Sequence, residues 1–299
     1  MSQAPSAIPL AVAPAPPRAL ARQSYEALRV FARNPSAIIG VLLLTVILAV
    51  TIFGPMLMQA DPFEIASAPM EPPGGEMLLG TDYLGRDVLT GMVYGGRATL
   101  LVGVVAAVLS MAIGLTVGAL AGYYGGWVDE TLMRITEFFQ VLPTLLFAMV
   151  LVTLFSPSLA TIAVAIGVVS WTGTARLARG EFLRLKRREY VLAERVIGAG
   201  DARIIWRVIL PNALAPLIVS ATLAIGTAIL FEAGLSFLGL GDPNIMSWGL
   251  MIGSNRPYIL TAWWAVTLPG AAIFLTVLAV SLIGDGLNDA LNPKSRGRS

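Results

Sequence analysis

The sequence predicts an all-α integral membrane protein with six transmembrane helices, and three observations support this. Of the 299 residues, 56% are hydrophobic and 13% are charged, whereas soluble domains carry about a quarter charged residues. Five apolar runs exceed the roughly 18 residues that identify a membrane span: 38–58, 98–128, 138–175, 208–231 and 257–284. The third run is interrupted at 155–158 by Phe-Ser-Pro-Ser, which ends one helix and begins another. Five runs therefore predict six spans.

These runs divide the chain into a predicted order of segments. Residues 1–36 form an N-terminal tail with an interfacial helix before Asn34, residues 37–58 the first span, and residues 59–96 an irregular external segment. Residues 97–286 hold five more spans and a cytoplasmic loop at 176–212, and residues 287–299 form a C-terminal tail.

The distribution of positive charge predicts the orientation. Short cytoplasmic loops of membrane proteins collect Lys and Arg. If the N-terminus is cytoplasmic, six spans leave only Arg86, Arg97 and Arg256 of the 20 basic residues on the outside. We therefore expect both ends of the chain in the cytoplasm.

The composition argues against catalysis by this chain. It contains no His and no Cys, which removes the commonest general base and the commonest metal ligand. Its only lysines are Lys186 and Lys294, and neither follows a glycine as a phosphate-binding loop requires. We expect a non-catalytic chain with no metal and no cofactor of its own.

Two acidic residues keep another class of protein open. An ion-coupled secondary carrier needs ionisable groups within its spans, and Glu232 and Asp285 are the candidates. For Glu232 a structural hydrogen-bonding role is at least an equal alternative. A membrane receptor or assembly scaffold that transports nothing is a third possibility.

The second span carries a stripe of small residues. Ser110, Gly114, Gly118 and Gly122 are four residues apart on one stripe, a spacing of small residues that lets two membrane helices approach closely. We expect these glycines to be helix-packing positions.

Residues 189–211, EYVLAERVIGAGDARIIWRVILP, combine charge, glycine and a helical period. We expect a helix that continues from the fourth span and breaks at Gly198. Asp201 should then cap a second helix, which Pro211 ends. This pattern suits a surface on which another protein docks, although a basic cytoplasmic loop that binds nothing is a common alternative.

The same segment resembles the loop of ATP-binding-cassette (ABC) importer membrane subunits, in which a Glu-Ala-Ala triplet precedes Gly and an Ile-x-Leu-Pro ending. Here the triplet positions are Leu192, Ala193 and Glu194, so only the central alanine matches, while Gly198 and Pro211 fit the frame. The resemblance implies that a coupling helix docks on the ATPases through Leu192, Ala193, Glu194, Gly198 and Asp201.

Other motifs resemble the dipeptide and oligopeptide permeases of this class. They are Leu-Gly-Thr-Asp at 79–82, Gly-Arg-Asp-Val at 85–88, EAGLSFLGLG and GDGLNDALNPK. The resemblance covers roughly residues 30–294. It implies a type I ABC importer permease fold and the role of the second, C-type permease of a pair.

The resemblance also implies partners and a substrate class. The partners are a second permease, an external solute-binding protein, the lipid bilayer and two cytoplasmic ATPases that hold ATP and Mg; nucleic acid is not among them. Dipeptides or oligopeptides are the expected solutes, with a nickel complex or glutathione as alternatives. Contacts with the binding protein or an outer gate are expected at Asp82, Arg86, Asp87, Gly239, Asp242 and Trp248.

The stretch between the fifth and sixth spans is rich in glycine and aromatic residues. We expect it to form re-entrant or lid-like structure at the outer face. The alternative for Trp248, Trp263 and Trp264 is a belt at the lipid headgroups.

Overall fold

The computed structural model describes residues 28–291, which form helices and three isolated β-bridges but no strand. Most of the predicted interfacial helix and the end of the C-terminal tail lie outside this range. The α-helices are α2 (Pro35–Met58), α3 (Val88–Tyr124), α4 (Gly126–Val141), α5 (Thr144–Phe155), α6 (Leu159–Leu185), α7 (Glu189–Val196), α8 (Asp201–Arg203), α9 (Leu210–Leu235), α10 (Trp248–Asn255) and α11 (Trp264–Leu291). Two π-helices, η1 (Ile204–Ile209) and η2 (Ser236–Leu240), flank α9, and a 3-10 turn, η3 (Arg256–Tyr258), follows α10.

The all-α membrane fold is confirmed, but one predicted span is divided. Five helical segments are long and apolar enough to cross a bilayer: α2, α3, α6, the run 201–240 that contains α9, and α11. The sixth candidate is the pair α4 and α5, which bends by 86°. The bend follows from Pro143, because a proline lacks an N–H and forces the preceding residue, Leu142, into an extended conformation.

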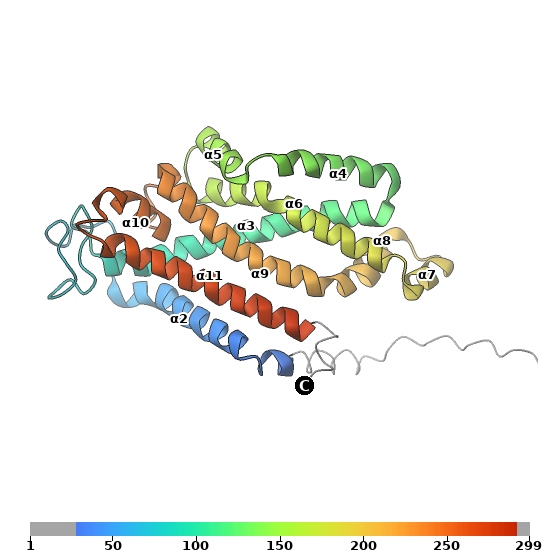
Figure 1. The fold of residues 1–299 in the computed structure, drawn as a ribbon, viewed down its shortest axis with the longest axis horizontal. Coiled ribbons are helices and arrows are strands. Elements are labelled where there is room, and N and C mark those ends of the chain that lie inside the picture. The colour runs from blue at the N-terminus through green and yellow to red at the C-terminus, as the bar shows by residue number, and fades with distance from the viewer. Residues whose placement is uncertain (1–27, 292–299) are drawn as a thin grey trace, which may run out of the picture.

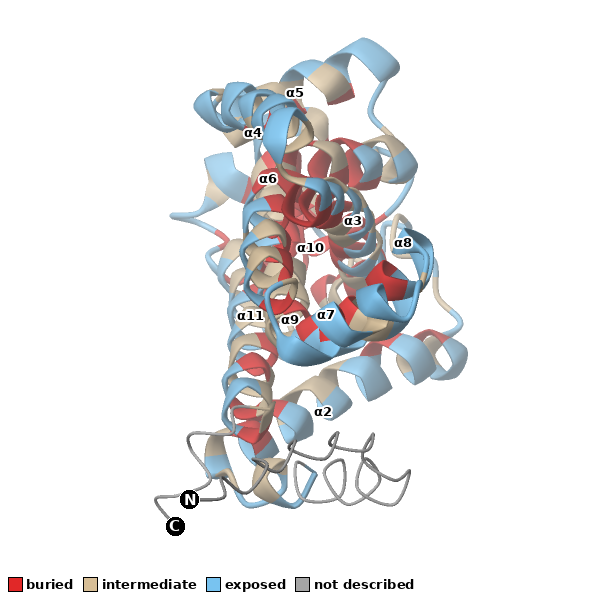
Figure 2. Cartoon of the chain, turned by 90° about the vertical axis from the view of Figure 1, so that its right-hand side faces the viewer, coloured by how far each residue is buried: buried red, intermediate tan, exposed pale blue. Residues whose placement is uncertain are grey.

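The long helices lie side by side, and α4 and α5 lie along one side of the bundle, next to α6 (Figure 1). α7 and α8 occupy one end, and α10 with the segment 59–87 occupies the other; we name these the α7 end and the α10 end. α11 packs between α2 and α9, and α3 packs against both α6 and α9. Buried residues concentrate where α3, α6 and α9 meet (Figure 2).

The outer faces of the bundle are apolar and exposed. Leu42, Val46, Val108, Leu154 and Phe274 are each more than half exposed. Such a surface is unfavourable in water but suits the hydrocarbon core of a membrane.

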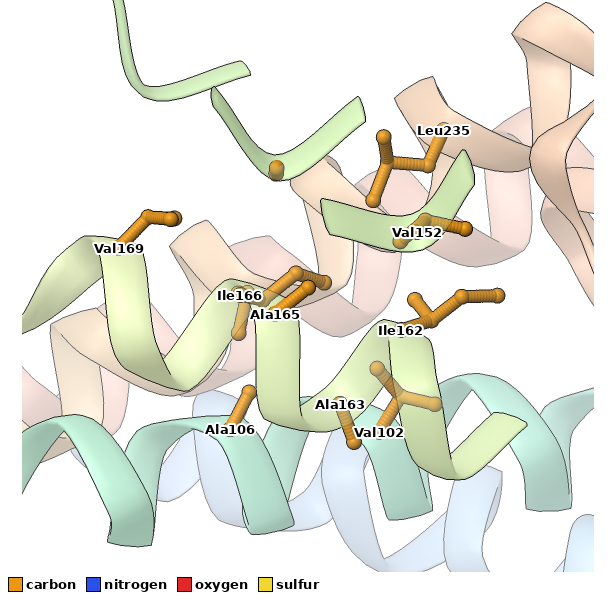
Figure 3. Close-up of a cluster of buried hydrophobic side chains, with 11 residues drawn as sticks. Val102, Ala106, Val152, Ile162, Ala163, Ala165, Ile166, Val169 and Leu235 are labelled. Carbon is orange, nitrogen blue, oxygen red and sulfur yellow. The ribbon is translucent and has the colours of Figure 1, made fainter. Parts of the chain in front are cut away.

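An apolar cluster fills the space between α3, α5, α6 and α9. It contains Val102 and Ala106 of α3, Ile162 and Ile166 of α6, and Leu235 of α9. Figure 3 shows Ala106 pointing from α3 toward α6. Most of this cluster lies on the α10 side of the helix midpoints, because Val102 precedes the middle of α3 and Ile162 and Ile166 precede the middle of α6, and both helices start at that end.

Candidate functional site

The segment after α6 forms a short helix at the end of the bundle. α6 ends at Leu185 and α7 begins at Glu189, so the predicted continuous helix is broken by the basic stretch 186–188. Cationic side chains at a helix C-terminus are favourable, because they face the partial negative charge of the last carbonyl groups. The break leaves α7 as a separate helix of eight residues.

Gly198 reverses the chain after α7. Its φ is +81°, a left-handed conformation that glycine adopts at little cost. The Gly198 N–H donates to the Arg195 carbonyl at 3.0 Å, and the Ala199 N–H donates to the Glu194 carbonyl at 3.0 Å. These two bonds form a Schellman motif, which satisfies the last carbonyl groups of α7.

Apolar packing attaches α7 to the bundle. Val191 is fully buried, in one cluster with Phe182 and Leu185 of α6 and with Ile204 and Ile209 of η1. A fully buried aliphatic side chain contributes about 1.5–3 kcal/mol relative to an exposed one. α7 is therefore held against α6 and the start of α9.

Two polar contacts link the turn to the bundle and to α7. The Tyr123 hydroxyl, at the end of α3, donates to Asp201 Oδ1 at 2.6 Å. Arg203 Nε lies 3.6 Å from Glu194 Oε2, so this ion pair joins α8 to α7 across the turn. The prediction that Asp201 caps the second helix is wrong, because Gly200 is the cap residue and Asp201 makes no capping bond. Tyr123 binds this carboxylate instead.

Two cations lie over the Tyr123 ring. Arg195 Cζ is 5.3 Å and Lys186 Nζ 5.9 Å from the ring centroid, within the range of cation–π attraction. Burial lowers the pKa of Lys186, as do the neighbouring charges of Arg195 and Arg187, while Asp129 opposes this shift. Tyr123 thus contacts charged side chains from the end of α6, from α7 and from the turn.

The opposite side of α7 is exposed and apolar. Leu192, Val196 and Ile197 are 48%, 87% and 74% exposed, and Ala193 and Gly198 are exposed beside them. We name these five residues the α7 surface. Because Val191 packs against the bundle on the other side of α7, the α7 surface is an exposed apolar patch.

The second helix of this segment does not end where the sequence indicated. The chain passes from η1 directly into α9, and Pro211 lies in the first turn of α9. A proline is tolerated there, because the first N–H groups of a helix have no partner within it. The prediction that Pro211 ends the helix is therefore wrong.

At the α10 end, Asp82 and Asp87 bind the backbone of their own segment. Asp82 Oδ1 accepts the N–H groups of Leu84 and Arg86 at 2.8 and 2.9 Å. Asp87 caps α3 and accepts the Thr90 hydroxyl at 2.6 Å. α3 thus begins at Val88, earlier than the predicted boundary at 97.

Arg86 lies within the same segment. Its guanidinium carbon is 5.0 Å from the centroid of the Phe63 ring. Its Nε is buried and makes no hydrogen bond within the described residues. The segment 59–87 is therefore irregular but internally ordered.

The residues that lie between the predicted fifth and sixth spans also contact other parts of the chain. Gly239 has a φ of +87° and forms the kink in η2. Asp242 Oδ2 accepts the Leu159 N–H at 3.1 Å, at the start of α6. Trp248 and Trp264 are 2% and 5% exposed, so the headgroup-belt alternative is wrong for both.

Glu232 has the structural hydrogen bonds that the sequence left open as an alternative, but its partners were not predicted. This carboxylate is 1% exposed and accepts hydroxyl groups of Ser236 and Ser247 at 2.8 Å and of Thr99 at 3.2 Å. Thr99 also accepts the Trp248 N–H at 3.2 Å. The network joins α3, α9, η2 and α10, and the only sequence signal for it was a lone acid in an apolar run.

The small residues of α3 face α6. A Cβ added at Gly114 would lie 2.6 Å from Thr174 Cβ, and one at Gly122 would lie 2.7 Å from Phe182 Cβ. A Cβ at Gly118 would meet the backbone of Ala175. Close approach of the two helix backbones therefore depends on these positions.

Comparisons with known proteins agree with this architecture. Residues 114–297 match the family described as "Binding-protein-dependent transport system inner membrane component". Residues 23–73 match the "N-terminal TM domain of oligopeptide transport permease C".

Among the described residues, no three His, Cys, Asp or Glu side chains cluster closely enough to hold a metal ion.

Curated relatives extend the similarity to most of the chain. A "Di/tripeptide transport system permease protein DppC" of Pseudomonas aeruginosa is 40% identical over 98% of this chain and 97% of its own length. "Dipeptide transport system permease protein DppC" of Escherichia coli is 44% identical over 88% and 91%. "Oligopeptide transport system permease protein OppC" of Bacillus subtilis is 37% identical over 91% and 90%.

A solved structure shares the fold. It is the inward-facing MetNI methionine ABC transporter, one chain of which is 22% identical to this chain, with a TM-score of 0.58 over 68% of this chain and 96% of its own. The apolar helices and the family match together identify a multi-pass inner membrane protein. This chain therefore belongs to the family of binding-protein-dependent transport system inner membrane components, the permease subunits of ABC importers.

Proposed function

We propose that this chain is the second, C-type permease of an ATP-driven importer that carries dipeptides or oligopeptides across a bacterial inner membrane. The observation that carries this proposal is the similarity to relatives named for di/tripeptide, dipeptide and oligopeptide transport, at 37–44% identity over most of both chains. The substrate class is therefore inferred from chains that match along nearly their whole lengths.

The proposed machine has four kinds of chain. This permease and a second, homologous permease enclose the path, and two cytoplasmic ATPases bind ATP and Mg. An external solute-binding protein delivers the peptide. The printed sequence contains no phosphate-binding loop, which supports a non-catalytic role for this chain.

The α7 end is proposed as the cytoplasmic end, with both chain termini on that side. Only Arg86, Arg97 and Arg256 then lie outside, in agreement with the positive-inside rule. The α7 surface would enter a groove of an ATPase, and Glu194 and Asp201 would hold its shape from within the turn.

Movement of the ATPases would reach the spans through α7. When ATP closes the ATPase dimer, α7 moves with it as a rigid lever. Because Val191 and Asp201 attach this segment to α6, α9 and α3, the bundle rocks between inward-facing and outward-facing states. Hydrolysis resets the path.

The α10 end is proposed to meet the binding protein. Asp82, Asp87 and Asp242 are bound to backbone N–H groups, so we propose that they fix the shape of this surface. Arg86, Gly239 and Trp248 would contribute to the same surface or to an outer gate.

The test is purification from the native membrane in mild detergent, with mass spectrometry of every co-purifying chain. A second permease, ATPases with phosphate-binding loops and a peptide carried by the binding protein are the expected result. Isolation of this chain without such partners, or of a binding protein that carries a nickel complex or glutathione, would overturn the corresponding part of the proposal.

A further inference from the structure

A cavity of about 220 Å³ lies between the middle parts of α3, α6 and α9. Its wall is rich in small and hydroxyl-bearing residues, among them Ser110, Ser170, Gly173, Thr174, Ser220 and Thr227. No charged residue lines it. The wall therefore combines apolar side chains with uncharged hydroxyl groups.

Two of these hydroxyl groups have no partner. Ser110 Oγ and Ser170 Oγ are buried and make no hydrogen bond within residues 28–291, and Ser110 is 2% exposed. An unsatisfied buried hydroxyl costs about 1–3 kcal/mol. Hydroxyl groups elsewhere in the spans avoid this cost by bonding to the carbonyl four residues earlier, as Thr45, Thr116 and Thr276 do.

The hydroxyl groups occur at one level of the bundle. On its α10 side the cavity is bordered by Ala106, Ile166 and Ala228, which also belong to the apolar cluster between α3, α5, α6 and α9. On α3 and α6 a serine thus lies one turn beyond the apolar residue, while α9 contributes Ser220 and Thr227 beside Leu223 and Ala224. Because Ser110 and Thr174 are buried, these hydroxyl groups face the interior of the bundle and not lipid.

The wall also contains open space. A Cβ added at Gly173 would meet no atom within 4 Å, unlike the glycines that pack α3 against α6. Gly173 therefore leaves room for an occupant and is not required for contact between helices.

We propose that this cavity is a section of the transport path whose unpartnered hydroxyl groups bond to the backbone amides of a passing peptide. This inference rests on the proposed function. A serine hydroxyl both donates and accepts, so it serves a peptide C=O or N–H alike. Amides occur in every peptide whatever its side chains, and neutral hydroxyl groups bind them weakly enough for release.

The test uses the complete complex with its binding protein, reconstituted in vesicles with radiolabelled alanyl-alanine. Ser110→Ala combined with Ser170→Ala should lower ATP-driven uptake about fivefold, the effect of one lost hydrogen bond, without lowering the unfolding temperature. Thr116→Val, on the same helix but bonded to its own carbonyl, is the control and should transport normally.

A bulky residue tests the space itself. Gly173→Leu should abolish uptake while the complex still assembles, whereas Gly270→Leu on α11, where an added Cβ also meets nothing, should be tolerated. Normal uptake by Gly173→Leu and by the double serine variant would overturn the path assignment. Absence of ATP-driven uptake by the wild-type complex would instead overturn the proposed function.

The cysteine-free sequence allows a second readout. Ser170→Cys should react with a small charged thiol reagent in at least one nucleotide state, and alanyl-alanine should slow the reaction. Val46→Cys on the exposed face of α2 should stay unlabelled. If Ser170→Cys is unreactive in every nucleotide state, the cavity is not part of a water-filled path.

Discussion

At the scale of single residues, Gly198 determines how the chain leaves α7. Its positive φ allows the Ala199 N–H to reach the Glu194 carbonyl. No neighbouring atom lies within 4 Å of a Cβ built there. The requirement for glycine is therefore one of backbone conformation within the chain, and any further requirement must come from a docked partner.

Gly198 thus offers a graded test of the lever. Gly198→Ala should destabilise the turn by about 1–2 kcal/mol, because alanine is strained at positive φ, while Gly198→Asn should cost less. Gly198→Trp should in addition obstruct a partner's groove. We expect ATP hydrolysis without uptake in the tryptophan variant, measured in vesicles of the reconstituted complex; normal uptake with solute-stimulated hydrolysis would contradict the lever assignment.

The hydrogen bond from Tyr123 to Asp201 can be tested separately. Tyr123→Phe removes this bond but keeps the ring beneath Arg195 and Lys186. We expect a loss of about 0.5–1.5 kcal/mol in local stability, seen as faster amide hydrogen exchange in the turn at 198–203. Tyr123→Leu also removes the ring and should accelerate exchange further. Equal exchange in the wild type and both variants would show that Tyr123 does not hold the turn.

At the scale of elements, α2 lacks one backbone hydrogen bond, and a side chain of α3 supplies a donor in its place. Pro55 has no N–H to offer the Thr51 carbonyl, and its ring displaces the carbonyl groups that precede it. Arg97 of α3 donates Nε to the Thr51 carbonyl at 2.7 Å and Nη2 to the Ile52 carbonyl at 2.5 Å. One arginine therefore both fills the gap in α2 and joins α2 to α3.

Arg97→Met should lower the thermal stability of the chain, because it leaves the Thr51 carbonyl, which receives no N–H from Pro55, without its donor. The expected cost is about 1–3 kcal/mol. Pro55→Ala restores an N–H to the Thr51 carbonyl, so the double variant should recover part of the loss. If the two changes are additive in thermal unfolding, the proposed compensation does not exist.

The helices α4 and α5 show where an element could be predicted and where it could not. The break at 155–158 was readable from its proline and serines, and α6 begins at Leu159 as expected. Pro143 was equally visible, but a proline indicates only that a helix breaks and does not specify the bend of 86°. α5 has 12 residues, about 18 Å at 1.5 Å per residue, so it is too short to cross about 30 Å of hydrocarbon alone.

At the scale of the whole molecule, the source of energy separates an importer from an ion-coupled carrier. Glu232, the strongest candidate for ion coupling, accepts three hydroxyl groups and joins both ends of the 232–248 stretch to α3. Asp285, the other candidate, is exposed on α11. This geometry favours a structural role for Glu232.

Glu232→Gln should therefore keep ATP-driven uptake, because an amide oxygen can still accept hydroxyl groups. Glu232→Ala should reduce the amount of folded protein, because it leaves buried hydroxyl groups unpaired. Both variants would be compared by fluorescence-detected size-exclusion chromatography and by vesicle uptake. Complete loss of uptake in a well-folded Glu232→Gln variant would favour the carrier.

The sequence predicted those parts of the fold that depend on local chemistry. The lengths of the apolar runs predicted the spans, and Gly198 predicted where the helix of α7 ends. Contacts between distant segments could not be predicted: Asp201 binds Tyr123 rather than capping its helix, and Trp248 is buried against Met92 and Thr99. The hydroxyl groups of the cavity come from three helices, and nothing within any one helix indicates that they meet.

Uptake by purified chains tests the central claim most directly. Vesicles would contain either this chain alone or this chain with its second permease and ATPases, and both would receive the binding protein and radiolabelled alanyl-alanine. We predict ATP-dependent accumulation only in vesicles with the complete set, and none from an ion gradient. Accumulation by this chain alone, driven by an ion gradient without ATPases, would contradict the account.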